Sequence, residues 1–448
     1  MLRHPSFGIW LLASGCLLAF LTVTDAHGQL STDSEPSEVV VEQADPQSPD
    51  NPIGIDSGPR VRQLGNTPDD LGNRAQEAEE QFDSLLPFGP LTPLRESWKA
   101  LNHRLRAATG LDFSFNYTVA YQHTDWANGP RDAAGGDFDL FGRWEMPEDC
   151  CRIPGQLALD TETRHSLGVI PPAELGSNIG SLWGTTVGYD VQDFTVYQLY
   201  WDQGSFEDGF RYRIGRTDAA LIYDGYRYAS DNYAFFSPAF SDTLPMPLPG
   251  SGLGAALAVY PYGETYVVAG VHDANGSKTR SGFDTFFGES EYFSAIEFGM
   301  TPNFGQEREG LYHITAWHTD ARRQMGRPSD RGIAVTLEQQ TGCNGNIVPF
   351  LRYAYSHRGL NGVRQNLSIG VGLEEVLGKN ADMIGCGFGW GQPSNRQLRD
   401  QYTFEAFYRI FLTPAAHLTP DIQVIVDPSN APTRESVTVF SLRLRTVF

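Results

Sequence analysis

Lysine is nearly missing from this chain of 448 residues: of its 33 basic side chains, only Lys99, Lys278 and Lys379 are lysines. The 54 acidic residues outnumber the basic ones and give a net charge of −21. No basic stripe is available to displace counterions from phosphates, so this balance argues against a nucleic-acid-binding protein. With 40% hydrophobic and 12% aromatic residues, the chain is also too apolar to be intrinsically disordered as a whole.

Cysteine is rare as well, and its scarcity excludes a disulfide scaffold. Cys16 falls in the N-terminal apolar stretch, which leaves Cys150, Cys151, Cys343 and Cys386. A bond between Cys343 and Cys386, or one from the adjacent pair, stays open. The ten histidines show no metal-ligand spacing, so we expect no metal site and no cofactor.

Only one long hydrophobic run occurs, from Phe7 to Val23, and it follows Arg3. Thr24-Asp25-Ala26 supplies a small-x-small cleavage pattern, so residues 1–26 are predicted to be a secretory signal peptide. A membrane-anchoring helix is the alternative, which Gly15 and the polar, acidic continuation disfavour. The mean hydropathy of −0.32 argues against a helical membrane protein. It does not argue against a β-barrel, because apolar and polar residues alternate along its strands and the mean hydropathy of such a chain is also low.

Residues 27–70 are predicted to be a disordered acidic tether. Positions 31–84 hold 13 acidic residues against three arginines, and the first part of this stretch has almost no large apolar side chain. Such a composition cannot bury enough surface to offset the entropy of ordering it.

Residues 71–109 are predicted to form short amphipathic helices. The first repeats apolar residues from Leu71 to Leu85, and the second has Thr92 as N-cap, Pro93 in its first turn and Gly110 at its end. One face of the second helix is an apolar stripe, and the other is basic. A plug or partner-binding helix is one interpretation, and a helix packed at the edge of the following domain is the one we favour. The stripe consists of Leu94, Trp98, Leu101 and Leu105, and the basic face of Arg95, Lys99, Arg104 and Arg106.

From Leu111 the period of the sequence changes to two. Apolar and polar residues alternate without error from Leu111 to Gln122, which indicates a strand with one apolar face. The pattern recurs to the last residue and predicts an all-β fold over 110–448, with an uncertain extra piece at Leu182–Val191. Sixteen strands are expected to start near Leu111, Asp137, Gln156, Phe194, Phe210, Leu253, Thr265, Glu291, Gly310, Gly332, Ile347, Gln365, Asp382, Gln401, Leu418 and Ser436.

The end of the chain favours a transmembrane antiparallel β-barrel over a soluble β-sandwich. Phe440, Leu442, Leu444 and the terminal Phe448 share one face of the last strand, opposite Arg443. Several strands are long enough for a tilted bilayer crossing of about 9–11 residues. A sandwich core would not tolerate the unpaired charges on the polar faces. A secreted β-protein with one solvated face per sheet is the alternative.

Several segments in this order resemble the carbohydrate-selective porins of the OprB type. The resemblance covers most of the chain from Leu94 to Phe448. The long acidic tether of this chain departs from the compact N-terminal start that is typical of the family. The resemblance implies a sixteen-stranded barrel through which sugars diffuse passively into the periplasm. The matching segments are GLDFSFNYTVAY (110–121), FRYRIGRTDA (210–219), YVVAGVHDANG (266–276), YTFEAFYRIFLTP (402–414), HLTPDIQVIVDPSNAP (417–432) and VFSLRLRTVF (439–448).

A sugar-selective pore needs planar donors, carboxylate acceptors and aromatic faces at a narrow point. The arginine fork suits pairs of hydroxyl groups better than the lysine ammonium, which gives a possible meaning to the scarcity of lysine. Strand alternation turns a set of charged residues inward, and we hypothesise that several of them line the constriction; the alternative is a mutually paired lattice without solute contact. This set is Glu162, Arg164, Arg211, Arg213, Arg352, Glu374, Glu405 and Arg409.

The irregular, proline-rich segment Gly225–Gly252 is the best candidate for a loop folded into the pore. Trp183, Trp201 and Trp390 could stack on sugar rings, but interfacial girdle positions are favoured for each of them.

No catalytic residues are expected, because G-x-S-x-G is absent and Asp160 with Glu162 has ordinary strand spacing. An outer-membrane barrel hydrolase and a secreted glycan-binding protein are the other function classes. The expected partners are sugars as solutes, outer-membrane lipid and the barrel assembly machinery, with a homo-oligomer left open and no nucleic acid. The expected location is the outer membrane of a Gram-negative-type bacterium.

Overall fold

The computed structural model describes residues 82–87, 89, 91–147, 152–304, 308–342, 345–376 and 382–448. The predicted signal peptide, the tether and most of the first predicted helix lie outside these ranges, as do Cys150, Cys151 and Cys343. Within them, no helix is long and apolar enough to cross a bilayer.

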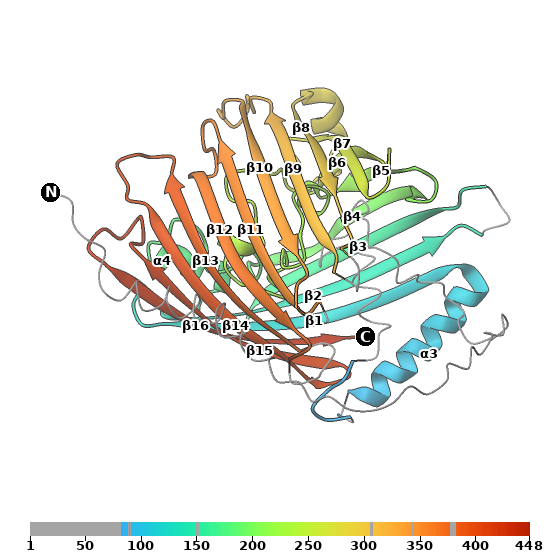
Figure 1. Ribbon diagram of the computed structural model, residues 1–448, viewed down its shortest axis with the longest axis horizontal. Coiled ribbons are helices and arrows are strands. Elements are labelled where there is room, and N and C mark those ends of the chain that lie inside the picture. Colours follow the sequence, from blue (N-terminus) through green and yellow to red (C-terminus); the bar gives the residue numbers. More distant parts are fainter. Residues whose placement is uncertain are drawn as a thin grey trace, which may run out of the picture. The chain divides into compact units, whose positions relative to one another are not determined.

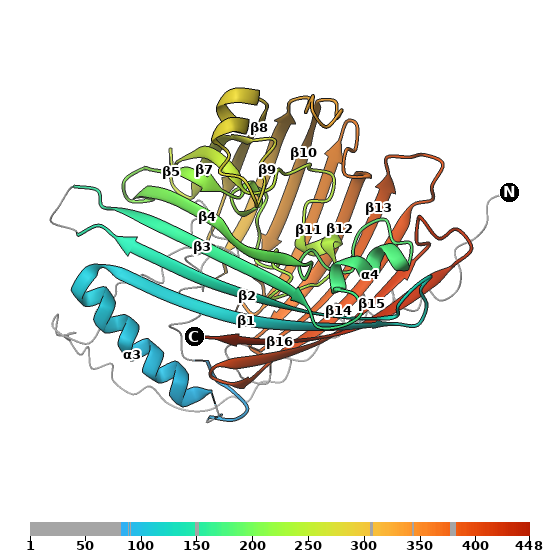
Figure 2. The same ribbon diagram turned by 180° about the vertical axis from the view of Figure 1, so that it is seen from behind.

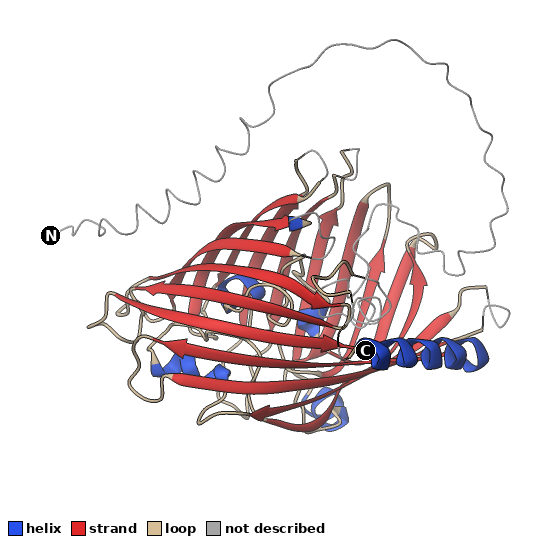
Figure 3. Ribbon diagram, turned by 90° about the horizontal axis from the view of Figure 1, so that it is seen from below, coloured by secondary structure: helices blue, strands red, loops and turns tan. Residues whose placement is uncertain are grey.

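The described strands are antiparallel and close into one barrel, in which each strand pairs with its sequence neighbours and β1 pairs with β16 (Figures 1 and 3). The sixteen predicted strands are therefore confirmed. The strands are β1 (Leu111–Thr124), β2 (Asp132–Glu145), β3 (Gly155–Ser166), β4 (Gln192–Ser205), β5 (Phe210–Thr217), β6 (Gly252–Val259), β7 (Thr265–Asp273), β8 (Tyr292–Met300), β9 (Gly310–Thr319), β10 (Asp330–Gln339), β11 (Ile347–Ser356), β12 (Val363–Glu374), β13 (Met383–Pro393), β14 (Gln401–Thr413), β15 (Ala416–Val426) and β16 (Ser436–Val447).

Closure of the barrel uses the last residue of the chain. The Phe448 amide donates to the Phe115 carbonyl at 2.9 Å, and the Phe115 amide donates to the Phe448 carbonyl at 3.0 Å. The two rings stack with centroids 4.8 Å apart. The terminal aromatic thus continues the β1–β16 ladder to its end, where an unpaired strand edge would otherwise face lipid.

The two faces of the wall differ as the alternation predicts. Outward apolar side chains such as Ile214, Ile296 and Phe440 are exposed, whereas inward polar side chains such as Arg213 and Glu297 are buried. An apolar exterior on a closed barrel matches a lipid solvent, because only hydrocarbon makes this arrangement favourable. The expected alternative of a secreted soluble β-protein is therefore wrong.

Two long connections fold into the barrel, and both leave the end of the wall opposite the chain terminus. The inner loop comprises residues 218–251 between β5 and β6, with a 3-10 turn η2 (Ala219–Leu221) and a short helix α5 (Pro238–Ser241). The second loop comprises residues 167–191 between β3 and β4, with α4 (Pro172–Asn178). Leu182–Val191, expected as an extra strand, is irregular instead. A π-helical turn η3 (Thr285–Glu289) lies between β7 and β8.

Helix α3 (Thr92–Thr109) precedes β1 and lies beside it, near the C-terminus (Figures 1 and 2). Pro93 lies in its first turn, and Gly110 ends it with φ of 75°, a left-handed conformation that favours glycine. The predicted helix before it does not extend to Leu85. The amides of Leu85 and Leu86 instead donate to the carbonyls of Phe411 and Leu412 at the end of β14.

Candidate functional site: the loop-filled lumen

Charged side chains from the barrel wall hold the inner loop in place. They come from six strands between β8 and β16, so the loop is fixed from several directions at once. We call these residues the anchor residues: Glu297 on β8, Glu338 on β10, Arg352 on β11, Glu374 on β12, Glu405 and Arg409 on β14, and Arg443 on β16.

Arg352 is the most extensively bonded anchor residue. Its guanidinium donates to the Asp224 carboxylate at 2.7 Å, to the carbonyls of Phe240 and Asp242 at 2.7 and 3.0 Å, and to the Thr243 hydroxyl at 2.8 Å. Its carbon Cζ lies 4.4 Å from the centroid of the Tyr226 ring. One planar fork therefore ties together both halves of the inner loop, which a lysine could not do with a single ammonium.

Glu405 accepts hydrogen bonds from the backbone of the inner loop just before α5. Its two carboxylate oxygens accept hydrogen bonds from the amides of Phe236 and Ser237, at 2.5 and 2.9 Å. The Ser237 hydroxyl in turn caps α5 by accepting from the Ala239 amide. The carboxylate thus satisfies two buried backbone donors that would otherwise be costly to leave unpaired.

Two arginines hold the stretch before α5. Arg443 donates to the carbonyls of Asp231 and Ala234, and its guanidinium lies over the Phe236 ring with Cζ 4.6 Å from the centroid. Arg409 donates to the Tyr233 carbonyl at 3.3 Å and lies 3.5 Å from the centroid of the ring of that same tyrosine. Both arginines combine cation–π contact with carbonyl hydrogen bonds in a buried site.

The pair of Arg227 and Glu374 is the most open part of the anchored region. Arg227 Nη1 donates to Glu374 Oε2 at 2.8 Å, and its backbone amide donates to Glu338 at 3.0 Å. The side chains of Arg227 and Glu374 are 27% and 24% exposed, while Glu338 is buried. The Tyr228 hydroxyl donates to Glu374 at 3.3 Å. A donor fork and a carboxylate therefore meet where solvent reaches them, and the buried Tyr228 supports the carboxylate from behind.

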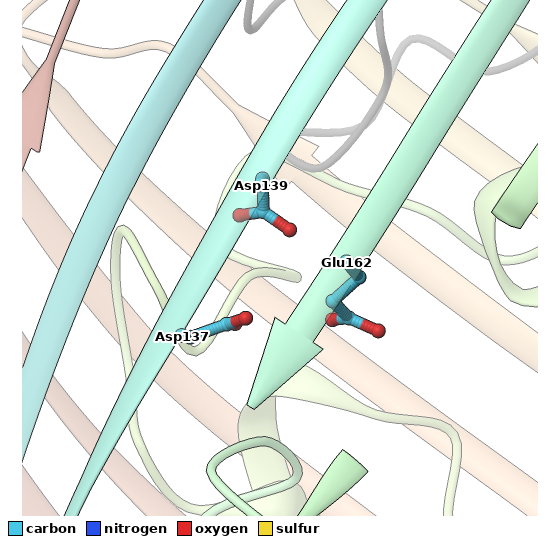
Figure 4. A group of neighbouring side chains, drawn as sticks. All are labelled: Asp137, Asp139 and Glu162. Atoms are coloured by element: carbon cyan, nitrogen blue, oxygen red, sulfur yellow. The ribbon is translucent and has the colours of Figure 1, made fainter. Parts of the chain in front are cut away.

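A second charged group lies on β2 and β3, where Asp137, Asp139 and Glu162 place oxygens within 4.8 Å of one another (Figure 4). Arg164 pairs with Glu162, with Asp137 at 3.4 Å and with Asp190 of the second loop at 3.0 Å. Three carboxylates offer ligands that a hard cation prefers, but here the positive charge comes from the arginine. The arrangement is an arginine–carboxylate cluster beside the second loop, to which Asp190 belongs.

Arg211 and Arg213 share one acid. Asp202 on β4 accepts from Arg211 Nε and Nη2 at 2.8 and 2.7 Å, and from Arg213 Nη2 at 3.0 Å. Arg213 also lies 3.9 Å from the centroid of the Tyr200 ring. Through these contacts the two arginines stabilise the wall between β4 and β5.

The two loops are bonded to each other. The Asp231 carboxylate accepts from the Thr186 hydroxyl at 2.7 Å and from the Gly188 amide at 2.6 Å. The Tyr189 hydroxyl donates to Asn232 Oδ1 at 2.5 Å. A displacement of the inner loop would therefore also disturb the second loop.

A face of glycines on β13 makes room for the loops. Gly385, Gly387, Gly389 and Gly391 alternate with outward residues, and a Cβ built on Gly387 would lie 2.6 Å from the Phe240 ring. A Cβ on Gly391 would lie 2.2 Å from the Trp183 ring. The aromatic side chains of both loops thus pack directly against bare backbone.

Burial also affects carboxyl groups of the inner loop itself. It raises the pKa of Asp242 above its ordinary value, although the amide of Thr243 and the nearby Arg352 charge oppose the shift. It likewise raises the pKa of Asp218, against a hydrogen bond from the Tyr197 hydroxyl. Both groups are more readily protonated in the packed loop than in water, because desolvation disfavours the charged form.

The structure places all eight predicted site residues on the inward face of the barrel. They fall into three groups that have different hydrogen-bond or ion-pair partners. Four of them are anchor residues, Arg211 and Arg213 pair with Asp202, and Arg164 pairs with Glu162. Solute contact by these residues stays a prediction. Sequence reasoning missed Glu297, Glu338 and Arg443, which share the inward alternation and could have been found by it.

Some features of the site could not be predicted from the local sequence, or the local sequence predicted a different position for them. Asp224 and Arg227 lie in an irregular segment, so no periodicity marks them. The glycine alternation in residues 383–391 is visible in the sequence, but alternation alone does not show what packs against it. Trp183 is buried inside the barrel against Gly391 rather than at an interface, so its expected girdle position is wrong.

A closed antiparallel barrel with an apolar exterior and a loop held inside a charged lumen defines a membrane pore protein of the porin class. The chain belongs to the carbohydrate-selective porin, OprB family, whose family model matches residues 161–448.

Curated relatives agree with this class. The chain is 24% identical over 274 residues to Porin AaxA of Chlamydia pneumoniae, covering 57% of this chain and 59% of that one. It is 25% identical over 241 residues to Porin AaxA of Chlamydia caviae, covering 49% and 50%. The matches therefore span little more than half the length of these relatives.

Solved structures show the same fold. The high-pH structure of Pseudomonas putida OprB superposes with a TM-score of 0.65 at 15% identity, covering 79% of this chain and 97% of that one. The low-pH structure of that protein gives a TM-score of 0.51 at 13% identity, covering 82% and 100%. At these identities the likeness concerns the fold alone.

Proposed function

We propose that the protein is a bacterial outer-membrane porin that lets neutral sugars diffuse passively through its lumen, narrowed by the inner loop. The observation that carries this proposal is the partly exposed pair of Arg227 and Glu374. It offers a planar donor fork and a carboxylate, which together suit the hydroxyl edges of a sugar.

The pairing of charges around the inner loop supports a neutral solute. Arg352 pairs with Asp224, and Arg227 pairs with Glu374 and Glu338, so these charges are compensated locally where the solute would pass. Each contact is individually weak enough for the solute to leave, as passive conduction requires. The long loops are expected at the cell surface and the short turns in the periplasm.

The remaining parts of the proposal come from the sequence and the family. Residues 1–26 direct export, residues 27–70 form an acidic tether, and the barrel assembly machinery folds the protein. The protein acts without catalysis. A homo-oligomer is compatible with the fold.

Liposome swelling tests the transport proposal. Proteoliposomes are expected to swell in isotonic neutral mono- and disaccharides faster than in charged solutes of equal size, because the charge pairs of the lumen favour hydroxyl groups over net charge. Liposomes without protein are the control. Equal rates for neutral and charged solutes would contradict sugar selectivity, and recovery of the native protein in a soluble fraction would contradict the membrane location.

Glu374→Gln tests the exposed pair directly. Loss of one charge-assisted hydrogen bond, worth about 1.5–3 kcal/mol, is expected to weaken sugar block of the single-channel current by roughly tenfold or more. The open-channel conductance without sugar is the internal reference. The matched control is Arg323→Gln, a change to an arginine that is 83% exposed outside the strands. Equal sugar block in wild type and Glu374→Gln would remove this pair from the solute path.

A further inference from the structure

Helix α3 contacts the barrel through its polar side. Asn102 hydrogen-bonds to the side chain of Asp112 and accepts from the Phe113 amide at 2.8 Å, and Arg106 pairs with Glu145 at 3.2 Å. Arg95 on the same side is fully buried. An amphipathic helix usually buries its whole apolar face against its own domain, and α3 departs from this arrangement.

Two leucines of the apolar stripe of α3 are turned away from the protein interior. Leu94 and Leu101 are 54% and 58% exposed, and they lie seven residues apart on one face, with Trp98 between them. In water, exposing two leucines side by side costs about 25 cal/mol for each Å² of apolar surface. Leu94 and Leu101 are thus left uncovered by the described residues, although the stripe to which they belong has the pattern of a buried face, and its other members Trp98 and Leu105 are half-buried.

The surface next to the stripe indicates what covers it. The Trp98 ring contacts Phe115 with centroids 5.1 Å apart, and Phe115 stacks on Phe448. Both phenylalanines belong to the outward face of the barrel, which continues along β16 as the exposed Leu444 and Leu442. The stripe is therefore continuous with the lipid-facing surface at the end of the barrel where the chain terminates.

The charge of α3 suits the same environment. The helix holds Arg95, Lys99, Arg104 and Arg106 against a single acid, Glu96. Arg104 is exposed, on the flank next to Leu101 and away from the barrel. A helix with an apolar stripe beside basic residues is typical of an element that lies in the interfacial plane of a bilayer.

We propose that α3 is a membrane-interface helix: it lies flat against the leaflet at the terminus end of the barrel, with Leu94 and Leu101 in the acyl chains and Arg104 at the lipid headgroups. The barrel must span a membrane for this, but the proposal does not depend on which solute the pore conducts. Trp98 would then sit where aromatic belts form, at the boundary between hydrocarbon and headgroups.

Added tryptophans in the full-length protein test this placement. Leu101→Trp puts the probe in the stripe, and Ala107→Trp puts it on the exposed face away from the stripe. The proteins are reconstituted in liposomes of phosphatidylcholine and phosphatidylglycerol, with and without lipids brominated near the headgroup end of the acyl chains. Emission added by each substitution is taken relative to the wild type, which has eight tryptophans.

The added emission of Leu101→Trp is expected to lose about half its intensity with brominated lipid and little with aqueous iodide, as for an interfacial probe. Ala107→Trp should respond to iodide and not to bromine. Two results would overturn the proposal: iodide quenching of Leu101→Trp equal to that of Ala107→Trp, or shielding from both quenchers. The second would mean that residues 1–81 or another copy of the chain cover the stripe. A heat-modifiable band verifies that each variant has folded.

Discussion

Arg352→Ala is expected to loosen the inner loop and to raise both the conductance of the pore and its current noise. The substitution removes the guanidinium that bonds to the Asp224 carboxylate and to the carbonyls of Phe240 and Asp242. Removing one partner of a buried charged pair costs about 3–5 kcal/mol. A change of that size shifts the equilibrium between the packed and the displaced loop by more than about a hundredfold.

Single-channel recording in planar bilayers measures this effect. Leu351→Ala is the matched control, because its side chain is the outward neighbour on the same strand and touches lipid instead of the loop. Arg352→Lys should lie between the two, since it keeps the charge but loses the fork that reaches both halves of the loop. Conductance and noise equal to the wild type in Arg352→Ala would show that this arginine does not hold the loop.

Gly387→Val is expected to expel Phe240 from the wall and to displace α5 with it. A Cβ at this position would lie 2.6 Å from the Phe240 ring, and that ring already packs against Phe235 with centroids 4.8 Å apart. Overpacking of this kind costs about 1–3 kcal/mol. The displaced loop should become sensitive to added protease and should change the conductance, while the barrel persists.

A double-mutant cycle separates this contact from a general folding defect. Phe240→Ala empties the space that the valine needs, so Gly387→Val with Phe240→Ala should be less disturbed than the two single effects added together, by about 0.5–3 kcal/mol. Cys386→Val, which changes the outward neighbour on β13, is the control and should leave the loop protected. Strictly additive effects in the cycle would contradict direct packing of Phe240 on Gly387.

The barrel is predictable from local pattern alone. The alternation from Leu111 onward, the strand starts and the terminal Phe448 depend on residues close in sequence, because a strand repeats its environment every second residue. The same alternation predicts that Arg352, Glu374 and Glu405 point inward, and the structure places them there. The left-handed cap at Gly110 is also visible as a glycine at a helix end.

The orientation of α3 is not predictable in this way. Its apolar stripe is recognisable in the sequence, but only Trp98 and Leu105 of the stripe are half-buried, and Leu94 and Leu101 stay exposed. Asn102 and Arg106 find partners on Asp112 and Glu145 instead. Which face of a helix meets the protein depends on what the rest of the fold presents to it, and here the stripe is left beside a surface that faces lipid.

Strand periodicity and hydrophobicity are local properties, so a sixteen-stranded membrane barrel with a charged inner face can be predicted from the sequence. Which charges meet depends on the tertiary structure. Asp224 and Arg352 are far apart in the chain and come together because barrel closure and the path of the inner loop bring them to one point. The partners of Arg227 and the contact of Phe240 with Gly387 have the same cause. The exposure of Leu94 and Leu101 depends instead on the surface that the barrel presents beside α3.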